Sequence, residues 1–438
     1  MPVLLVPFVV VGAGLSSWLS LPEEPVSAIC ALVFSILVTA ATTSIVALLA
    51  LRLGSTGRGA YVAAVGFALG TIAPTYAQTL FSEPLLAFLT LASLYLAMGE
   101  TRRAWTSSIL LGGLAILAKP TGIVVGPVLS IYWLMKRRPR AIVLGPFVAI
   151  ALGTLIYLGY NYLRFNHPLV TGQPVSTNFQ ITGMPKRFFG LLFGPGMGGG
   201  LVWYCPPVIL AVLGFRKALR HKRAEGLAIV GILLGYLGIY SFWLCCGWDW
   251  GPRFLVPALP GLMALAGLVD YRGRRILIGL TIIGLGINAP TLISLYERYY
   301  WEVQTAGANV HALSLWTDLS SAPLFNVWGA AIRQLSDAAG TDARVLLADA
   351  IATSNSSIET DTPVMMQIVP VWWWLLPVIG LPVWLGILMA AGLIAAGIGA
   401  VYWGWQAAKV YDASAQAPGE STMYCTDSRG GSTSSSST

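Results

Sequence analysis

Two ionisable residues lie beside stretches of sequence that are otherwise apolar enough to enter a membrane. Lys119 separates two short apolar stretches, Trp105–Ala118 and Thr121–Leu134, and Glu83 begins a third one. A lysine at membrane depth costs about 2.5–3.5 kcal/mol on insertion scales, so it needs a carboxylate, a water-filled cavity or an anionic ligand. Two interpretations stay open: Glu83 and Lys119 form a structural ion pair, or they line a polar cavity that opens outward.

Arg253 stands at the start of a helix expected over Phe254–Val269 and follows Trp248, Asp249 and Trp250. A helix N-terminus carries unpaired N–H groups and partial positive charge. Together with a guanidinium, these groups favour recognition of a phosphate. The alternative is an interfacial arginine that pairs with Asp249. Trp248 and Trp250 serve either as interfacial belt residues, which we favour, or as platforms for a lipid or sugar ring.

The elements that position these residues are expected to be membrane helices. The 438 residues are 56% hydrophobic and only 10% charged, whereas a soluble domain carries about 25% charged residues. We therefore predict an all-α polytopic membrane protein, with about 11–12 membrane-embedded helices around an outward-facing cavity. The longer apolar segments include Leu4–Leu19, Ala28–Leu51, Ala141–Tyr160, Leu227–Leu244 and Val371–Trp403.

The net charge of +8 is explained by membrane topology. Sixteen of the 26 Lys and Arg residues lie in short connections between apolar segments. These connections fall on one side if the spans alternate, and the positive-inside rule makes that side cytoplasmic. This distribution argues against nucleic-acid binding. The connections are Arg52–Arg58, Arg102–Arg103, Lys136–Arg140, Arg216–Arg223 and Arg272–Arg275.

The same rule fixes the depth of Lys119. The basic groups Arg102–Arg103 and Lys136–Arg140 are both cytoplasmic, so the chain between them crosses outward and returns. Each of the two short helices rises about 20 Å at 1.5 Å per residue, less than the roughly 30 Å hydrocarbon core. We therefore expect the turn at Lys119–Pro120 to lie below the outer surface, within the membrane region.

Five short motifs occur in an order that resembles a known family. Each is weak alone, but together they resemble bacterial polytopic glycosyltransferases of the GT-C type, related to protein O-mannosyltransferases and aminoarabinose transferases. The likeness covers about residues 1–300. The motifs are Leu80-Phe81-Ser82-Glu83-Pro84-Leu85, Ala118-Lys119-Pro120-Thr121, Tyr160-Asn161-Tyr162-Leu163-Arg164-Phe165, Val202-Trp203-Tyr204-Cys205-Pro206-Pro207 and the segment from Gly251 to Pro260.

The resemblance implies an enzyme of the bacterial inner membrane that takes a sugar from a polyprenyl-phosphate donor. It passes this sugar to a glycan, lipid or protein acceptor at the outer face. Lys119 and Arg253 match basic residues that hold the donor phosphate, and Asp249 and Trp250 lie beside them. Glu83 matches an acidic position and is the candidate catalytic residue.

Asn161 and Arg164 begin the long outer loop 161–206 and are candidate contacts to donor or acceptor. Its glycine-rich part, Gly194–Gly200, is either a flexible lid over a cavity or a set of tight turns. Some relatives use a divalent metal, so one is possible here. No His/Asp/Glu cluster appears in the sequence, however, and we assign no metal ligand.

One departure from the family concerns the start of the chain. Family members begin with a helix and a first outer loop that carries an essential acid, whereas Met1–Pro7 resembles the segment just after that loop. We therefore expect a truncated chain or a start assigned too late, and we name no general base. A non-catalytic membrane subunit is one alternative function. A transporter or flippase of a lipid-linked or anionic substrate is another, although no inverted repeat supports it.

The expected organisation has four parts. Residues 1–295 form the membrane core, residues 296–368 an extracytoplasmic loop region, and residues 369–404 a C-terminal membrane helix. The Gly/Ser/Thr-rich composition of residues 405–438 is typical of a disordered tail.

Overall fold

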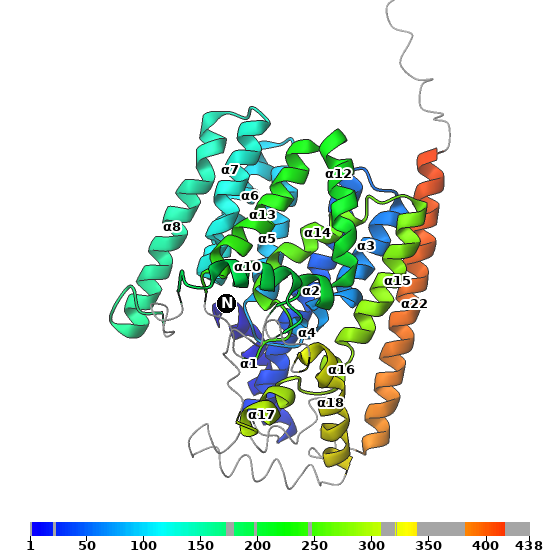
Figure 1. The fold of residues 1–438 in the computed structure, drawn as a ribbon. Helices are drawn as coiled ribbons and strands as arrows, with labels where there is room; N and C mark the ends of the chain where they lie inside the picture. The colour runs from blue at the N-terminus through cyan, green and yellow to red at the C-terminus, as the bar shows by residue number, and fades with distance from the viewer. Residues whose placement is uncertain are drawn as a thin grey trace, which may run out of the picture.

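The computed structural model of the chain describes residues 2–20, 23–171, 179–196, 199–243, 248–307, 320, 322–339 and 382–416. In these ranges the regular structure is α-helical or 3₁₀-helical, with no strand. The helices pack side by side into one bundle (Figure 1). The bundle contains α1 (Pro2–Leu19), α2 (Glu23–Arg52), α3 (Gly57–Gly70), α5 (Glu83–Ala97), α6 (Arg102–Ala118), α7 (Val125–Met135), α8 (Arg140–Phe165), α12 (Ala211–His221), α13 (Arg223–Ser241), α14 (Leu259–Ala266), α15 (Tyr271–Asn288) and α22 (Val383–Gln416).

Further helices connect these elements or cap one end of the bundle. In Figure 1, α17 and α18 lie at the lower end of the molecule, near the lower part of α1. The connecting and capping helices are α4 (Ala73–Ala77), η1 (Pro120–Val124), α10 (Met184–Phe193), α11 (Leu201–Tyr204), η2 (Pro206–Leu210), η3 (Arg253–Ala258), α16 (Pro290–Ile293), α17 (Glu297–Thr305) and α18 (Pro323–Ala339).

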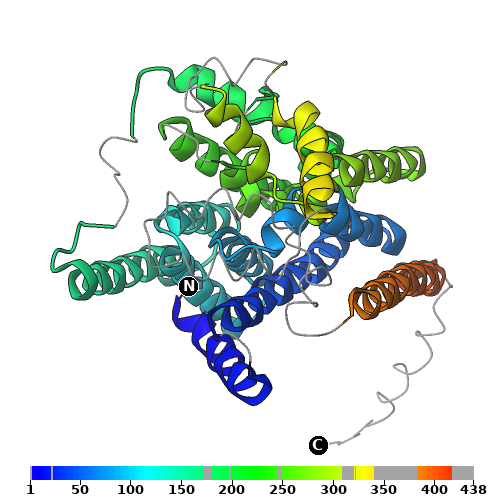
Figure 2. The same cartoon turned by 90° about the horizontal axis from the view of Figure 1, so that it is seen from below.

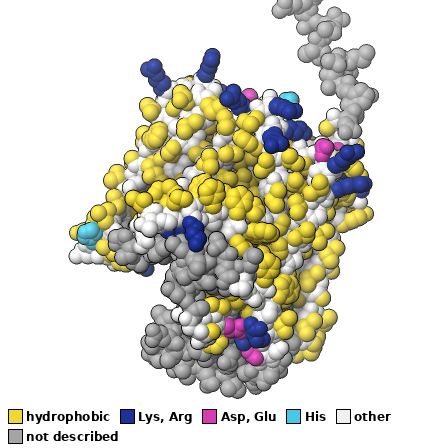
Figure 3. All heavy atoms as spheres, in the orientation of Figure 1, with side chains coloured by type: hydrophobic (Ala, Val, Ile, Leu, Met, Phe, Trp, Pro, Cys, Tyr) yellow, Lys and Arg dark blue, Asp and Glu magenta, His cyan; other side chains and the backbone are white. Residues whose placement is uncertain are grey.

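The outer surface of the bundle is apolar. On α8, the side chains of Leu152, Leu155 and Ile156 are 57–64% exposed, and hydrophobic side chains form a broad band across the face seen in Figure 3. An exposed apolar surface of this extent is favourable in contact with lipid but unfavourable in contact with water. The described residues contain four helices long and apolar enough to cross a membrane: Val26–Arg52, Arg140–Phe165, Arg223–Ser241 and Trp384–Ala415. The prediction of an all-α polytopic membrane protein is confirmed.

Basic side chains gather at one end of the bundle, at the top of Figure 3. Three of the helices that start at this end have a side-chain N-cap. Their capping residues Thr56, Thr101 and Asp270 each accept a hydrogen bond from a main-chain N–H. The expected loop Arg216–Arg223 is wrong, because Arg216 to His221 form the last turns of α12 and Arg223 starts α13. The clustering of basic residues agrees with the predicted cytoplasmic end.

The centre of the bundle is α14. All eight of its residues are buried, as expected for a short helix that is apolar on every side. The neighbouring α12 approaches it closely at Gly214, where an added Cβ would lie 1.8 Å from the carbonyl oxygen of Leu265. Because η3 runs directly into α14, this packing holds Arg253, the first residue of η3, in place.

Two peripheral helices differ from their predicted bounds. Helix α8 continues to Phe165 and ends where Asn166 adopts a left-handed conformation, with φ of 54°. The expected start of the C-terminal helix, at residue 369, lies outside the described residues. Helix α22, described from Val383, continues to Gln416, past the expected limit at residue 404. At this end Asp412 pairs with Arg58 at 2.9 Å. Figure 2 shows α8 and α22 at opposite edges of the molecule.

Candidate functional site

Three helix ends bring the predicted ionisable residues together. Glu83 is the first residue of α5, Lys119 follows the last residue of α6, and Arg253 is the first residue of η3. Helix α6 starts at the basic Arg102, so Lys119 lies at the end of that helix remote from the basic connection. The prediction that two short helices meet at Lys119–Pro120 is confirmed, with the turn of η1 between them.

These residues form a four-membered charge cluster. The Nζ atom of Lys119 donates to Glu83 Oε1 at 2.7 Å. The same oxygen lies 3.3 Å from Arg253 Nε, and Arg253 Nη1 lies 2.8 Å from Asp249 Oδ1. Both ion pairs considered from the sequence are therefore present. One carboxylate oxygen of Glu83 also joins them into a single network.

The carboxylates and the cations of the cluster differ in how far their side chains are exposed at the protein surface. The side chains of Glu83 and Asp249 are 3% and 4% exposed, whereas those of Lys119 and Arg253 are 22% and 18% exposed. The carboxylates thus lie behind the cations and hold them in position. A ligand that reaches the cluster meets the cations first.

Aromatic rings surround the two cations. Lys119 Nζ lies 4.6 Å from the ring centroid of Phe254, and Arg253 Cζ lies 4.3 Å from that of Phe81. The rings of Tyr240 and Phe254 stack with centroids 4.3 Å apart and planes 7° apart. Such contacts stabilise a cation by about 0.5–2 kcal/mol and limit its movement. They also exclude water from one side of each charge.

The cations keep donor capacity for a ligand. Arg253 Nη1 pairs with Asp249 and the buried Nε approaches Glu83 outside hydrogen-bond geometry, while the side chain as a whole stays 18% exposed. An ammonium has three N–H donors, and the hydrogen bond described for Lys119 Nζ uses one of them. Two partly exposed cations with spare donors suit an anionic group such as a phosphate.

Trp250 belongs to the core rather than to the membrane interface. Its side chain is fully buried, and its Nε1 donates to Asn288 Oδ1 at 2.7 Å. The interpretation of Trp250 as a belt residue is therefore wrong. The Tyr76 hydroxyl lies 2.8 Å from Trp250 O and 3.0 Å from Trp250 N, which fixes the segment that precedes Arg253. A role for Trp250 in binding substrate stays a prediction.

Asn161 and Arg164 lie apart from this cluster in the contacts described. Both residues are in the last turns of α8, not in a loop, because the helix continues to Phe165. Asn161 is buried and donates to Pro168 O at 3.2 Å. Arg164 is exposed and lies over the ring of Phe165, with Cζ 4.9 Å from the centroid. Their predicted contacts with donor or acceptor stay untested.

The glycine-rich segment forms tight turns in its described part. The N–H groups of Gly194 and Gly200 both donate to Gly190 O, at 2.8 and 3.0 Å. An added Cβ at Gly199 would lie 2.5 Å from that same oxygen. This close approach requires glycine and agrees with the tight-turn interpretation.

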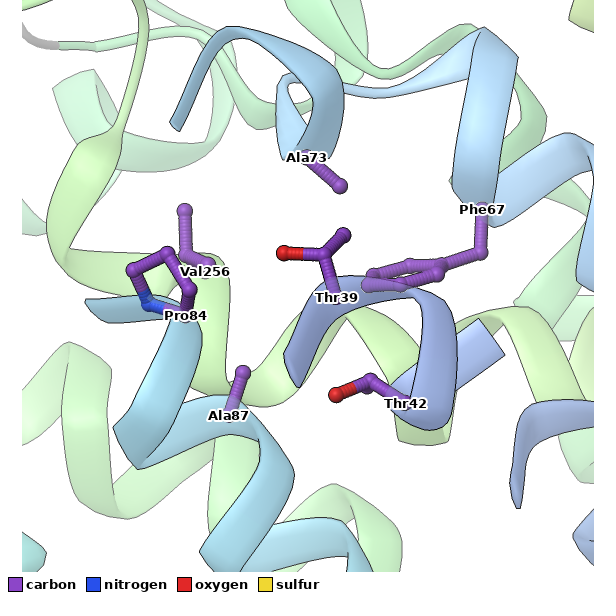
Figure 4. Close-up of a pocket in the computed structure, with 7 residues that line it drawn as sticks. All are labelled: Thr39, Thr42, Phe67, Ala73, Pro84, Ala87 and Val256. Carbon is purple, nitrogen blue, oxygen red and sulfur yellow. The ribbon is translucent and has the colours of Figure 1, made fainter. Parts of the chain in front are cut away.

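A small internal cavity lies behind the cluster, beside Pro84 (Figure 4). Its volume is about 10 Å³, enough for about one water molecule. Thr39 and Thr42 line it, but their hydroxyl groups donate to main-chain oxygens within α2. It is a packing gap rather than a substrate site, and the expected outward-facing cavity stays a prediction.

Several residues at the site were not identified from the sequence. Phe81 and Phe254 stand within the quoted motifs, next to Glu83 and Arg253, so their positions offered a signal. Tyr240 comes from α13 and belongs to no motif, so only the tertiary structure places it here. The described residues hold no group of three or more His, Cys, Asp or Glu side chains suited to a metal ion, and we assign no metal ligand.

Comparisons with known proteins place the chain in a family. The sequence matches no curated protein. Two solved structures of ArnT from Cupriavidus metallidurans, bound to undecaprenyl phosphate and in the apo state, are similar at 18% and 16% identity. Both align over 82% of this chain, with TM-scores of 0.43 and 0.42. The chain covers 63% and 62% of the length of those proteins. The model of glycosyltransferase family 87 matches residues 3–245, more than half of the chain, and the chain therefore belongs to glycosyltransferase family 87.

Proposed function

We propose that this protein transfers a sugar from a polyprenyl-phosphate donor to an acceptor at the outer face of the membrane. The observation that carries the proposal is the pair of partly exposed cations, Lys119 and Arg253, backed by two buried carboxylates. Family 87 membership supplies the reaction class. The apolar surface supplies access to a donor dissolved in the bilayer.

The cluster is suited to a reaction in which negative charge develops on the departing polyprenyl phosphate. The acceptor hydroxyl oxygen bonds to the anomeric carbon, and its proton passes to a base. The bond from that carbon to the phosphate oxygen breaks, and the electron pair leaves with the polyprenyl phosphate. Lys119 and Arg253 stabilise this developing negative charge, which is the contribution that accelerates transfer.

The carboxylates act as positioning residues in this proposal. Glu83 Oε1 contacts both cations and fixes their separation, and Asp249 directs the guanidinium of Arg253. A carboxylate so engaged is a poor acceptor for a further proton, so this geometry favours positioning over base catalysis for Glu83. The general base is a separate group.

The arrangement also supports a reaction at the outer face of the membrane. The cluster lies at the end of α6 opposite the basic connection at Arg102. By the positive-inside rule this end faces away from the cytoplasm. We place the protein in the bacterial inner membrane, as the resemblance to polytopic glycosyltransferases implies.

The proposal is tested by transfer of a radiolabelled sugar from undecaprenyl-phosphate-linked donors in membranes that contain the full chain. A panel of donors and a mixed glycan and lipid acceptor fraction are supplied. We expect transfer by the wild-type chain and at least a 100-fold loss in the Lys119→Met/Arg253→Ala double variant, since both cationic groups are removed.

Arg275→Ala is the matched control. It removes an exposed arginine from the basic end of α15, and we expect unchanged transfer. Equal transfer by the double variant and the wild type would remove the cluster from the reaction. Uptake or flipping of the labelled lipid without covalent transfer would instead establish a transporter.

A further inference from the structure

A surface cavity lies between the two helices that cap the outer end of the bundle. It measures about 340 Å³ and is lined by residues of α17 and α18 together with Ala306. Small-molecule sites span roughly 300–1,000 Å³, so the cavity suits a ligand of one or two rings but not a lipid chain. The lining residues are Tyr299, Glu302, Val303, Ala306, Phe325, Asn326, Gly329 and Arg333.

The charged groups of this cavity neutralise one another. Arg333 makes a two-point contact with Glu302, with Nε to Oε1 at 3.1 Å and Nη2 to Oε2 at 2.5 Å. Arg298 contacts Glu302 Oε1 at 3.0 Å and Asp337 at 2.5 Å. Burial alone would raise the pKa of Glu302, but hydrogen bonds from the two arginines lower it. Each of these cations thus contacts a carboxylate, which disfavours an anionic ligand at this cavity.

The remaining lining combines an aromatic surface with fixed polar groups. The Phe325 side chain is 59% exposed, an apolar face that packs well against the C–H face of a sugar ring. Asn326 uses Nδ2 to donate to the main-chain oxygens of Ser320 and Ala322, at 2.8 and 3.0 Å. Its Oδ1 is thereby oriented and serves as an acceptor for a hydroxyl group.

The cap is attached directly to the charge cluster. The Tyr300 hydroxyl donates to Asp249 O, and the rings of Tyr296 and Trp250 lie 6.2 Å apart. Gln334 of α18 accepts the N–H of Leu295 at 2.9 Å. The cap that holds this cavity therefore packs against the segment that carries Asp249 and precedes Arg253.

We infer that the cavity between α17 and α18 is a binding site for a neutral carbohydrate, which holds the acceptor of the transfer reaction. The identification of this carbohydrate as the acceptor rests on the proposed function. The carbohydrate site itself is inferred from the residues that line the cavity. The balanced charges disfavour a phosphate or an acidic sugar. The small volume disfavours a folded peptide segment.

Gly329 offers a test that removes no binding group. It lies on the cavity wall, and the atoms that an added Cβ would meet belong to the flexible end of Arg333, the nearest at 3.3 Å. Gly329→Leu fills the cavity and also replaces glycine by a good helix former. Gly397→Leu in α22 is the matched control, because an added Cβ there meets nothing within 4 Å.

The measurement is saturation-transfer NMR with the full chain in lipid nanodiscs, which avoids detergents with sugar headgroups. The probes are the neutral methyl glycosides of glucose, mannose, galactose and arabinose, each alongside glucuronic acid. We expect a signal from at least one neutral glycoside, stronger than that from glucuronic acid. This signal should persist in Gly397→Leu and fall at least fivefold in Gly329→Leu.

Three results would overturn the inference: no signal from any neutral glycoside, a signal that Gly329→Leu leaves unchanged, or a stronger signal from glucuronic acid. Undecaprenyl phosphate binding, measured on the same samples, separates the two proposals. The protein could give a neutral-sugar signal that depends on Gly329 and yet fail to bind undecaprenyl phosphate. That result would support the carbohydrate site in the cavity and would count against a polyprenyl-phosphate donor.

Discussion

The ammonium group of Lys119 lies 2.7 Å from Glu83 Oε1, yet 22% of the lysine side chain is exposed and only 3% of the glutamate. The pair is therefore one-sided. The Glu83 carboxylate is enclosed by protein, whereas the Lys119 ammonium can contact a ligand while it remains paired with Glu83. This arrangement reconciles the two interpretations of Lys119, because an ion pair that stabilises the fold can also present a cation.

The one-sided pair predicts unequal costs for removing its members. Glu83→Gln leaves Lys119 and Arg253 without their shared carboxylate, and we expect a loss of about 3 kcal/mol in unfolding free energy. Lys119→Met leaves Glu83 beside Arg253 and removes a partly solvated charge, so we expect a loss of about 1 kcal/mol. Unfolding in nanodiscs, followed by tryptophan fluorescence, measures both values.

The double variant Glu83→Gln/Lys119→Met completes this cycle. We expect it to be less destabilised than the sum of the single variants, since each single change strands a charge that the double change removes. Equal losses for the two single variants would show that Lys119 is as structural as Glu83, and its presentation to a ligand would then lose support.

Arg253→Lys probes the shape of the second cation rather than its charge. A lysine keeps the positive charge but cannot hold Asp249, Glu83 and a phosphate with one planar fork. We expect the KM for a polyprenyl-phosphate donor to rise about tenfold, with a loss of about 1–2 kcal/mol in unfolding free energy because the contacts to Asp249 and Glu83 are weakened. Steady-state transfer at varied donor concentration gives the result. A wild-type KM would assign the phosphate to Lys119 alone.

The sequence predicted that two short helices meet at Lys119–Pro120, because the lengths of the apolar runs and the positions of basic residues are enough to place that turn. The depth of Lys119 in the membrane stays a prediction. The sequence also suggested the pairs Glu83–Lys119 and Asp249–Arg253. It did not predict that Glu83 bridges both cations, because that contact depends on how α5 packs against η3. Residues far apart in the chain meet only through tertiary packing, which no local pattern records.

Two errors have local physical causes. The apolar run ends at Tyr160, which predicts a loop at Asn161 and Arg164. Both residues are nevertheless helical, and α8 continues until Asn166 turns left-handed. The abundance of tryptophan at membrane interfaces predicts an interfacial position for Trp250. Its hydrogen bond to Asn288, 38 residues later, places it in the core instead.

The orientation of the bundle predicts which surfaces a membrane-impermeant thiol reagent can reach. In a chain whose five cysteines are replaced by alanine, Leu335→Cys on α18 should react in intact cells. Arg220→Cys on α12 should react only after the membrane is opened. Both positions are exposed, so burial does not account for a difference. Labelling of Arg220→Cys from outside would invert the topology.

Glu297, at the start of α17, predicts how the stability of the cap formed by α17 and α18 depends on pH. Its Oε2 atom and the hydroxyl of Tyr296 are buried and have no hydrogen-bond partner in the described part of the chain. Burial, with a smaller effect from the charge of Asp249, raises the pKa of Glu297 from 4.5 to about 7. The folded protein thus binds a proton that the unfolded chain releases between these two values.

The unfolding free energy should therefore fall as the pH rises from about 4.5 to about 7. Above about pH 7, Glu297 should cause no further change. The expected change is on the order of 1–3 kcal/mol. Glu297→Gln replaces the carboxyl group by a neutral amide of the same shape, so it should keep the low-pH stability and flatten the slope. Urea unfolding in nanodiscs at pH 4.5, 6 and 8 tests this. Glu23→Gln, at an exposed position of α2, serves as the control, and a slope that Glu297→Gln fails to reduce would assign the pH dependence to another group.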